Sequence, residues 1–478
     1  MTQPVLHWFR RDLRLQDNTA LNAALDTGQP VVCVFVLDDA MLASDQLGVP
    51  RLRLLLAALH ALDAELRDHG SRLLVRRGQP LAILPGLVSE FNAGALYFNA
   101  DYTPLSTRRD QAIAAGLPVL VHQYDDVVIH PPGSVRTQGD TPYKVFTPFK
   151  RTWWQQPKPA VQPLARGLFA RLSAEQMGGL PDLRDLGFST DVDVPDARPE
   201  VARLRLDAFV RGPIFEYATG RDWLRANPFE DAASSTSAIS CYLRLGMLSP
   251  RQAWAAGSEA FDMADARERQ SVETWLTQLA WRDFFTHILA LFPYVDRRAF
   301  NPVYEALPYR TAAGELAAWQ AGQTGFPVVD AAMRQLNTLG WMHNRARLIV
   351  SSFLTKHLLL DWREGERYFM RTLIDGDPAV NNGNWQWAAG TGTDAQPFFR
   401  IFNPVSQSKK FDRHGDYIRA WVPELRDLPD QHLHEPWKAA APPKGYPPPM
   451  LDLDAGRERA LRAFDVVRQF RAALKAAE

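Results

Sequence analysis

The sequence predicts an α/β N-terminal domain with a doubly wound parallel sheet, followed by an all-α C-terminal domain. Up to about residue 130, short runs rich in β-branched and aromatic residues alternate with helical runs, as in a mainly parallel sheet covered by helices. From residue 201 onward the apolar periodicity is helical almost throughout. With 478 residues, 46% of them hydrophobic, the chain can bury more than one core.

Five short apolar runs are the expected strands, at 5–9, 31–38, 72–77, 95–100 and 118–125. Helical periodicity or helix-favouring composition lies between them, at 19–25, 51–69, 81–91 and 106–115. No GxGxxG follows the first strand, so the usual fingerprint of dinucleotide binding is absent from the sequence.

The expected domain boundaries follow from prolines. Pro131, Pro132 and Gly133 end the α/β domain, here 1–133, and repeated prolines mark 134–200 as a connector. Residues 142–154 place Lys144 and Lys150 beside aromatics, which we interpret as a docking segment. The helical domain is then 201–478, with helices expected at 251–260, 272–291, 314–320, 328–339 and 457–477 and through much of 341–404.

Charge and cysteine content limit the classes of function. Lysine plus arginine and aspartate plus glutamate number 54 each, so attraction to nucleic acid must come from local patches. One such patch would form if basic residues converge, namely Arg345, Arg347, Lys356, Arg400, Lys409, Lys410 and Arg413. Cys33 and Cys241 lack metal or redox spacing, and no metal is expected. No apolar run reaches membrane length and no signal-peptide pattern opens the chain, so a cytoplasmic protein is expected.

Polar residues interrupt apolar helical faces between 341 and 404. Trp341, Asn344, Arg347 and Leu348 have helical spacing, which predicts a shared face able to contact a polar ligand. The run 375–378, Asp-Gly-Asp-Pro, predicts a helix end and a restart, with an aspartate at N-cap and proline at N1.

Three further sequence patterns each have two interpretations. The hydroxyl-rich run 235–240 suits a pyrophosphate, although serine and threonine more often simply cap helices. Gln278, Trp281 and Arg282 suit an unstacked base or a buried aromatic helix. Trp362 and Trp385 suit a one-electron relay or ordinary core packing.

Taken together, these residues resemble the photolyase and cryptochrome family, and most closely the class I cyclobutane pyrimidine dimer photolyases. The resemblance covers nearly the whole chain. It rests on HWFRRDLRLQDN, YKVFTPFK, TSAIS, LAWRDFF, TGFPVVDAAMRQLNTLGWMHNRAR, DWREGERYFM, DGDPAVNNGNWQWAAGTGTDAQPFFRIFNP and HEPWK. It implies an antenna-binding α/β domain, a helical domain that holds FAD, and light-driven repair of UV-damaged DNA by electron transfer from reduced FAD to a flipped dimer.

The resemblance also assigns roles to residues. The FAD-binding set that it implies is Tyr217, Thr236, Ser237, Ala238, Ile239, Ser240, Arg282, Arg347, Asp375, Gly376, Asp377 and Asn381. The set implied for the lesion and the DNA is Arg221, Gln278, Trp281, Asn344, Arg345, Leu348, Trp387, Gln407 and Lys410. Asn381 would lie near flavin N5, and Trp385, Trp362 and Tyr309 would deliver electrons to the flavin.

Four positions depart from the family pattern. Gln278 replaces a glutamate that binds the dimer, and Leu348 replaces a methionine. Tyr309 replaces the outer tryptophan of the electron-transfer triad, for which Trp319 is an alternative. Ser106 replaces a glutamate of folate-binding relatives, which favours a deazaflavin or flavin nucleotide antenna, or none, over methenyltetrahydrofolate.

Two other functions remain open from the sequence. A cryptochrome-type photoreceptor would sense light without repair, but Asn381 and Trp387 are retained and no long disordered tail follows the helical domain. A (6-4) photolyase would share Gln278 but should carry a histidine proton donor where Leu348 stands. We expect a monomer, the default for the family.

Overall fold

The computed structural model describes residues 3–173, 176, 179–224, 226–230, 234–395, 397 and 399–477. The chain divides into two compact units. Unit 1 comprises Met1–Ala218, Ser237–Pro293 and Ile374–Asp377, and unit 2 comprises Thr219–Thr236, Tyr294–Leu373 and Pro378–Glu478. Each unit therefore combines segments that are far apart in the sequence.

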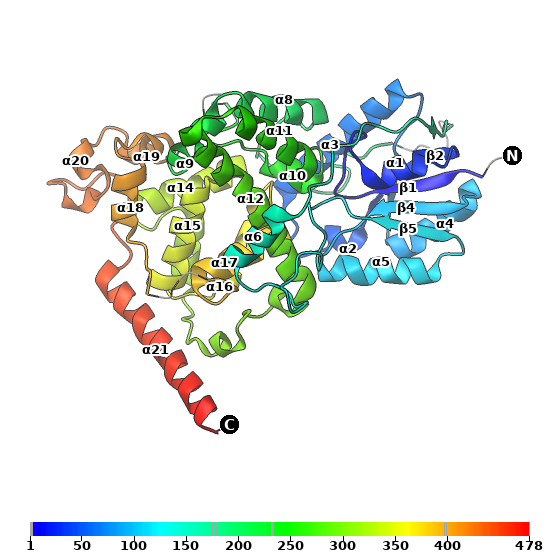
Figure 1. Ribbon diagram of the computed structural model, residues 1–478. Helices are drawn as coiled ribbons and strands as arrows, with labels where there is room; N and C mark the ends of the chain where they lie inside the picture. The colour runs from blue at the N-terminus through cyan, green and yellow to red at the C-terminus, as the bar shows by residue number, and fades with distance from the viewer. Residues whose placement is uncertain are drawn as a thin grey trace. The chain divides into compact units, whose positions relative to one another are not determined.

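Unit 1 contains the predicted sheet. Its strands are β1 (Val5–Phe9), β2 (Pro30–Leu37), β3 (Leu74–Arg77), β4 (Ala95–Asn99) and β5 (Leu120–Tyr124). They lie in the order β3-β2-β1-β4-β5, and every pairing is parallel (Figure 1). This confirms the five predicted strands, each within two residues at either end.

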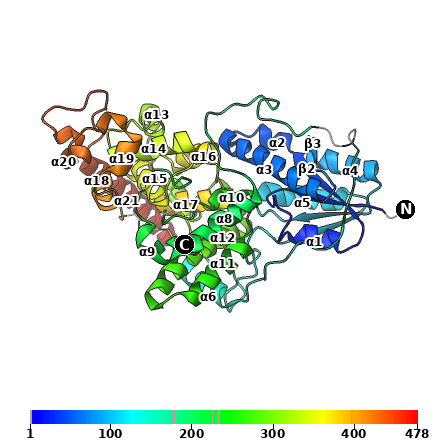
Figure 2. The same ribbon diagram turned by 90° about the horizontal axis from the view of Figure 1, so that it is seen from above.

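Helices cover both faces of the sheet, since all five residues of β1 and of β4 are buried. The helices are α1 (Thr19–Leu25), α2 (Asp39–Leu42), α3 (Val49–Asp68), α4 (Pro80–Phe91) and α5 (Pro104–Gly116) (Figures 1 and 2). One core cluster joins Leu6, Trp8 and Val34 of the strands to Leu84 of α4 and Ile113 of α5. The sequence predicted four of these helices, and it missed α2, which is a single turn.

The proline-rich connector also contributes to the sheet, which the sequence did not predict. β6 (Leu168–Phe169) pairs in parallel with the start of β2. A Cβ on Gly167 would lie 2.7 Å from the Leu25 carbonyl oxygen, so the connector passes too close to α1 for any larger residue. α6 (Phe146–Gln155) forms within the predicted docking segment.

The rest of unit 1 is helical. It contains α8 (Pro199–Val210), η1 (Pro213–Glu216), α10 (Ser240–Leu245), α11 (Pro250–Met263) and α12 (Ala266–Leu291), while α9 (Tyr217–Gly220) runs into unit 2. Reciprocal hydrogen bonds cap the starts of α11, between Ser249 and Gln252, and of α12, between Asp265 and Glu268. These caps fix where α12 begins, and α12 carries three of the predicted site residues.

Unit 2 has no strand among its described residues. Its α-helices include α13 (Ala313–Ala321), α14 (Pro327–Leu339), α15 (Asn344–Ser352), α16 (Trp362–Thr372), α17 (Pro378–Ala389), α18 (Pro404–Phe411), α19 (Asp416–Trp421), α20 (Asp430–Leu433) and α21 (Leu453–Ala477). Short turns lie between them, namely η2 (Pro293–Asp296), η3 (Pro302–Ala306), the π-helical turn η4 (Phe353–His357), η5 (Pro423–Leu425) and η6 (Pro436–Lys438). In the described part of the chain, none of the helices combines the length and apolar character needed to cross a bilayer.

Two local predictions near the site have different outcomes. The predicted restart is confirmed, because α17 begins at Pro378. The predicted helical face shared by Trp341 and Asn344 is wrong, because α15 begins only at Asn344. The His343 ring nitrogen Nδ1 accepts the Arg345 N–H at 3.2 Å and so caps the helix there, which leaves Trp341 outside it.

Candidate functional site

In unit 1, both ends of the short helix α10 bind the segment that precedes α17. The Ser240 hydroxyl donates to Asp375 Oδ2 at 2.6 Å, and Arg244 Nε donates to the Gly376 carbonyl at 2.8 Å. Four residues of the predicted FAD-binding set, Ser240, Asp375, Gly376 and Asp377, are therefore held in one place. The segment 375–377 thus presents two carboxylates, and Ser240 of α10 adds a hydroxyl beside them.

Arginines crowd this region. Arg11 pairs with Asp377 and, at 3.1 Å, with Asp101. Burial and, to a lesser extent, the neighbouring cation Arg11 lower the pKa of Arg244 to about 9. Burial alone would raise the pKa of Asp101, but Arg11 and Arg244 bring it down to about 2. The arginines therefore keep Asp101 ionised.

One hydrogen-bond donor of this arginine cluster is unsatisfied among the described residues. Arg244 Nη1 is buried and has no hydrogen-bond partner among the described residues. Leaving a buried donor unsatisfied costs about 1–3 kcal/mol, so the arrangement fits a ligand that carries carbonyl or phosphate oxygens. Sequence reasoning missed Arg11 and Arg244. Arg11 lies in the quoted motif HWFRRDLRLQDN, which was the available signal.

The hydroxyl-rich loop before α10 is only partly engaged. Trp275 Nε1 lies 3.4 Å from Ser237 Oγ in unit 1. Thr236 Oγ1 lies 3.5 Å from His343 Nε2 in unit 2. Ala238 has a positive φ of 49°, which is uncommon for a residue with a side chain. A strained backbone beside weakly bonded hydroxyls is typical of a loop shaped for a ligand.

Tyr217 and Arg282 complete the unit 1 part of the predicted FAD-binding set. The Tyr217 ring meets Phe209 edge to face at 6.1 Å. Arg282 donates to the carbonyls of Val127 and, at 3.3 Å, of Leu243. Its guanidinium thus ties α12 to two neighbouring segments, and burial lowers its pKa.

α12 also carries two residues of the predicted lesion set. The Trp281 ring stacks on Phe146 with a centroid distance of 3.5 Å and an angle of 9°. Gln278 Nε2 donates to the Thr274 carbonyl of its own helix at 3.0 Å. One face of the Trp281 indole is therefore covered by protein, and one amide hydrogen of Gln278 is engaged.

In unit 2, two of the predicted DNA-binding residues lie over the ring of Phe411. Arg345 pairs with Asp222 at 2.8 Å, and its guanidinium lies 4.3 Å from the centre of the Phe411 ring. The Lys410 ammonium lies 5.1 Å from the same ring. Arg221 and Gln407 are half-buried. Arg345 and Lys410 thus place two cations over one aromatic ring. Lys356, which was also expected in a basic surface patch, is instead buried in the core, where its ammonium donates to the Ala389 carbonyl at 2.6 Å.

The lesion-set residues of α15 and α17 differ in exposure. Asn344 is exposed, and Leu348 and Trp387 are half-buried. Arg347 Nε donates to the Met342 carbonyl at 2.9 Å. Arg347 belongs to unit 2, and its predicted partner Asp375 belongs to unit 1.

Asn381 of α17 is buried, and its orientation is fixed by α16. Its Nδ2 donates to the Glu366 carbonyl oxygen at 3.0 Å. The amide oxygen therefore points away from α16. Burial raises the pKa of the Glu366 carboxyl to about 7, and Asp296 contributes in the same direction.

The predicted electron donors lie in the core of unit 2. Trp385 and Trp362 are both buried there. The Trp385 ring contacts Trp319 at a centroid distance of 6.1 Å and Phe369 at 5.0 Å. The Tyr309 hydroxyl is buried with no hydrogen-bond partner among the described residues, and burial raises its pKa.

Comparisons with known proteins agree with this fold. Residues 5–166 match the family model described as DNA photolyase, and residues 275–466 match the FAD binding domain of DNA photolyase. A deoxyribodipyrimidine photo-lyase of Halobacterium salinarum is 40% identical over 97% of this chain and 99% of its own length. That of Escherichia coli is 38% identical over the same shares.

Solved structures give the same result. A class III photolyase from Agrobacterium tumefaciens superposes with a TM-score of 0.87 and 35% identity, covering 98% of each chain. A Synechocystis cryptochrome gives 0.85 and 27%, covering 96% of this chain and 99% of the other. The fold and the site thus define a FAD-binding protein of the photolyase and cryptochrome type. The chain belongs to the DNA photolyase family.

Proposed function

We propose that this chain is a deoxyribodipyrimidine photo-lyase, an enzyme that uses light to split cyclobutane pyrimidine dimers in DNA. The observation that carries the proposal is similarity over almost the full length, at 38–40% identity, to proteins of that name. The site residues of unit 1 and unit 2 described above support it, because they supply donors for a flavin and cations for DNA.

FAD is the proposed cofactor, and the residues fit it. When bound and reduced, FAD supplies the electron that opens the cyclobutane ring after light is absorbed. The hydroxyls of Thr236, Ser237 and Ser240 would hold its phosphates. Ser240 remains oriented by Asp375 at 2.6 Å, and Tyr217, Ala238, Ile239, Arg282, Arg347, Gly376 and Asp377 would complete the enclosure.

Asn381 would control the proton at flavin N5. Its amide nitrogen is already bonded to the Glu366 carbonyl, so the oxygen is the atom left to accept a hydrogen bond from the ring. A fixed acceptor of this kind stabilises the reduced cofactor without moving during the reaction. The role of Asn381 is thus to hold one hydrogen bond in place.

The flipped dimer would be bound by side chains that stack or donate. Trp281 has one indole face covered by Phe146, and its ring also contacts Phe284 at 5.8 Å and Phe285 at 5.3 Å. A pyrimidine would therefore meet only the part of this half-buried indole that the three rings leave exposed. Gln278 keeps one of its two amide hydrogens after bonding to Thr274. The remaining lesion contacts would be Asn344, Leu348 and Trp387, and the DNA backbone would meet Arg221, Arg345, Gln407 and Lys410.

Electrons for reducing the flavin would pass through Trp385. Trp362 and Tyr309 are the next donors by resemblance. A specific contact favours Trp319 as a second route, because its ring touches Trp385. Beyond Trp319 lies Tyr368, at 5.9 Å, whose hydroxyl donates to Asn337 Oδ1 at 2.6 Å. Tyr368, unlike Tyr309, has a hydrogen-bond acceptor for its proton.

A second chromophore is part of the proposal. The Ser106 hydroxyl donates to Asp101 at 3.1 Å, so this position offers no free carboxylate for a folate. We therefore favour a deazaflavin or a flavin nucleotide. A photolyase from Sulfolobus tokodaii is 31% identical, with a TM-score of 0.81 over 97% of this chain and 99% of that one. It is described with two FAD molecules, which are said to imply a novel light-harvesting cofactor. We also propose a cytoplasmic monomer that acts on UV-damaged DNA.

Survival of cells tests the function. A bacterial strain without photolyase would be UV-irradiated with and without this chain, and then kept in blue light or darkness. The proposal predicts a survival gain in light only, and loss of that gain in an Asp375→Ala variant that lacks the Ser240 partner. Equal survival with and without the expressed, flavin-loaded protein would favour the photoreceptor alternative.

A further inference from the structure

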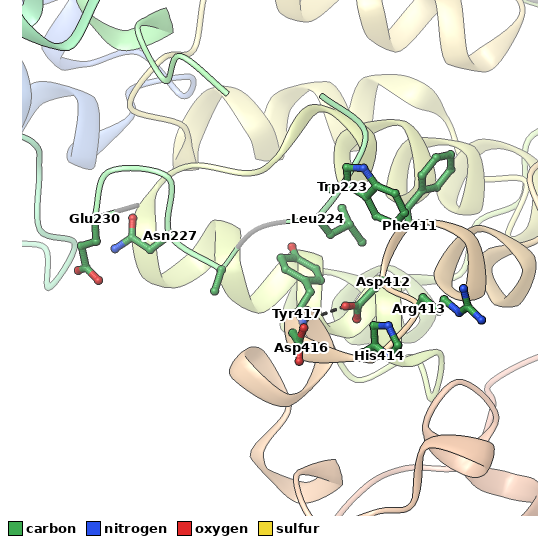
Figure 3. A pocket seen from close by; sticks show the side chains of 11 residues that line it. Trp223, Leu224, Asn227, Glu230, Phe411, Asp412, Arg413, His414, Asp416 and Tyr417 are labelled. Carbon is green, nitrogen blue, oxygen red and sulfur yellow. Dashed lines mark hydrogen bonds between the residues drawn. The ribbon is translucent and has the colours of Figure 1, made fainter. Parts of the chain in front are cut away.

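A pocket of about 670 Å³ lies in unit 2, between residues 223, 224, 226, 227 and 230 on one side and residues 411–414, 416 and 417 on the other (Figure 3). Its two sides are joined by a hydrogen bond from the Leu224 N–H to the Phe411 carbonyl, at 3.2 Å. Its volume lies within the range of small-molecule sites, roughly 300–1,000 Å³. None of its lining residues has a role in the proposed binding of FAD, the dimer or the DNA backbone.

Trp223 gives the pocket an aromatic surface. Its side chain is 46% exposed, whereas tryptophan side chains in globular proteins are on average highly buried. Figure 3 shows it beside Phe411 at one end of the pocket, with Glu230 and Asn227 at the other. An exposed indole over a cavity of this size provides a stacking platform for a flat heterocycle.

The pocket is continuous with the proposed DNA-binding residues. Phe411, which forms its wall, carries Arg345 at 4.3 Å and Lys410 at 5.1 Å on its ring. Asp222, the partner of Arg345, directly precedes Trp223 in the chain. A DNA strand whose phosphates meet Arg345 and Lys410 therefore passes the mouth of the pocket.

Charge decides which part of a nucleotide enters. Two carboxylates, those of Glu230 and Asp416, line the pocket and are exposed, together with the guanidinium of Arg413 and the ring of His414. Asp412 also lines it, but its carboxylate accepts the N–H groups of Tyr417 and Ile418, each at 3.0 Å. Carboxylates repel phosphate and accept hydrogen bonds from base amino groups. The base would enter, and its phosphate would stay outside near the cations.

We propose, on the basis of the proposed function, that this pocket holds an unpaired nucleobase of the bound DNA, stacked on Trp223, at a position outside the pyrimidine dimer. It is a positioning subsite for the nucleic acid, separate from the residues that bind the dimer itself. The pocket would bind the base by stacking, which is tolerant of sequence.

The test compares a short substrate with a long one. The isolated dinucleotide dimer cannot reach the pocket, whereas a single-stranded oligonucleotide with a central dimer can. Trp223→Ala should weaken binding of the oligonucleotide in the dark by about five- to 150-fold, equivalent to ~1–3 kcal/mol. It should leave dinucleotide binding and light-driven dinucleotide repair unchanged, and Trp223→Phe should recover most of the loss.

Two controls make the result decisive. Phe470→Ala removes an aromatic ring that is also 46% exposed and does not line the pocket, so it should leave both affinities unchanged. Abasic sites placed successively outward from the dimer should reveal one position at which wild type and Trp223→Ala bind equally. Equal oligonucleotide affinity of wild type and Trp223→Ala, or an equal loss for both substrates, would overturn the subsite. Failure of wild type to repair even the dinucleotide would instead contradict the proposed function.

Discussion

The indole of Trp385 meets the indole of Trp319 edge to face, with ring centroids 6.1 Å apart and planes at 75°. Trp319 is fully buried, and its Nε1 donates to the Val350 carbonyl at 3.2 Å. This contact gives Trp385 a neighbouring redox-active ring that chain order alone does not reveal. It bears directly on which residue supplies electrons to the proposed flavin.

The first prediction concerns this relay. Trp319→Phe should slow flavin photoreduction severalfold, because it removes a redox-active neighbour of Trp385. Tyr309→Phe should change the rate by less than twofold, since the buried Tyr309 hydroxyl has no acceptor among the described residues for the proton that an oxidised tyrosine releases. The rates would be followed by flavin absorbance under constant illumination with an external reductant. A larger effect from Tyr309→Phe than from Trp319→Phe would assign the terminal step to Tyr309.

The second prediction concerns Asn381. Asn381→Ala removes the amide that Glu366 orients at 3.0 Å, so the reduced flavin should reoxidise in air about tenfold faster, equivalent to ~1.4 kcal/mol for one hydrogen bond. Asn384→Ala is the matched control, because Asn384 is exposed on the same helix and bonds only to the Val380 carbonyl of that helix. Equal reoxidation rates in the two variants would remove Asn381 from the role proposed here.

The third prediction concerns the packing of α16 on α17. A Cβ on Gly365 would lie 2.1 Å from the Trp385 ring, so Gly365→Ala should destabilise the protein by about 1–3 kcal/mol through overpacking. Gly86→Ala lies in α4 with no atom within 4 Å of the new Cβ, and it should be neutral or stabilising by up to ~1 kcal/mol. Thermal unfolding of both variants checks this, and an unchanged midpoint for Gly365→Ala would refute the close approach.

The fourth prediction concerns pH. Burial raises the pKa of Glu366 to about 7, so the folded state holds this proton more tightly than the unfolded state. Its contribution to stability is therefore complete below the unfolded pKa of ~4.5 and is lost as the pH rises through about 7. Glu366→Gln should not show this loss. The difference in unfolding free energy between variant and wild type should shift in favour of the variant by up to ~3 kcal/mol between about pH 5 and pH 8.

Urea unfolding at both pH values measures the difference in unfolding free energy between Glu366→Gln and wild type. Comparing the two proteins cancels the contributions of the other titrating groups, such as Asp283. If the difference does not vary with pH, the Glu366 carboxyl titrates at its ordinary value. A difference that varies in the opposite direction would mean that Glu366 is ionised and paired in the folded protein.

The sequence was most informative where local pattern determines structure. The run 5–9 predicted β1 with its correct ends, because alternating faces of the sheet are both apolar. Pro378 predicted the start of α17, because proline fits the first turn of a helix. It was less informative at Trp341, since the cap formed by His343 depends on a ring nitrogen whose direction no periodicity encodes.

Only some of the site residues could be predicted from the sequence. Long motifs identified Ser240, Asp375 and Asn381 through resemblance. Arg11 was not predicted to meet Asp377, because 366 residues separate them in the chain. Trp223 lies in a segment without periodicity, so only its exposed fraction and its place beside a pocket single it out. Long-range partners and exposure are properties of the folded chain.

The most direct measurement is repair of a single lesion in vitro. The reduced, FAD-loaded protein would be mixed with an oligonucleotide that contains one cyclobutane thymine dimer, and a matched oligonucleotide would carry a (6-4) photoproduct. Blue light should restore the two thymines of the cyclobutane dimer, darkness should not, and the (6-4) photoproduct should persist. No restored thymine in light, with reduced FAD verified in the same sample, would contradict the account.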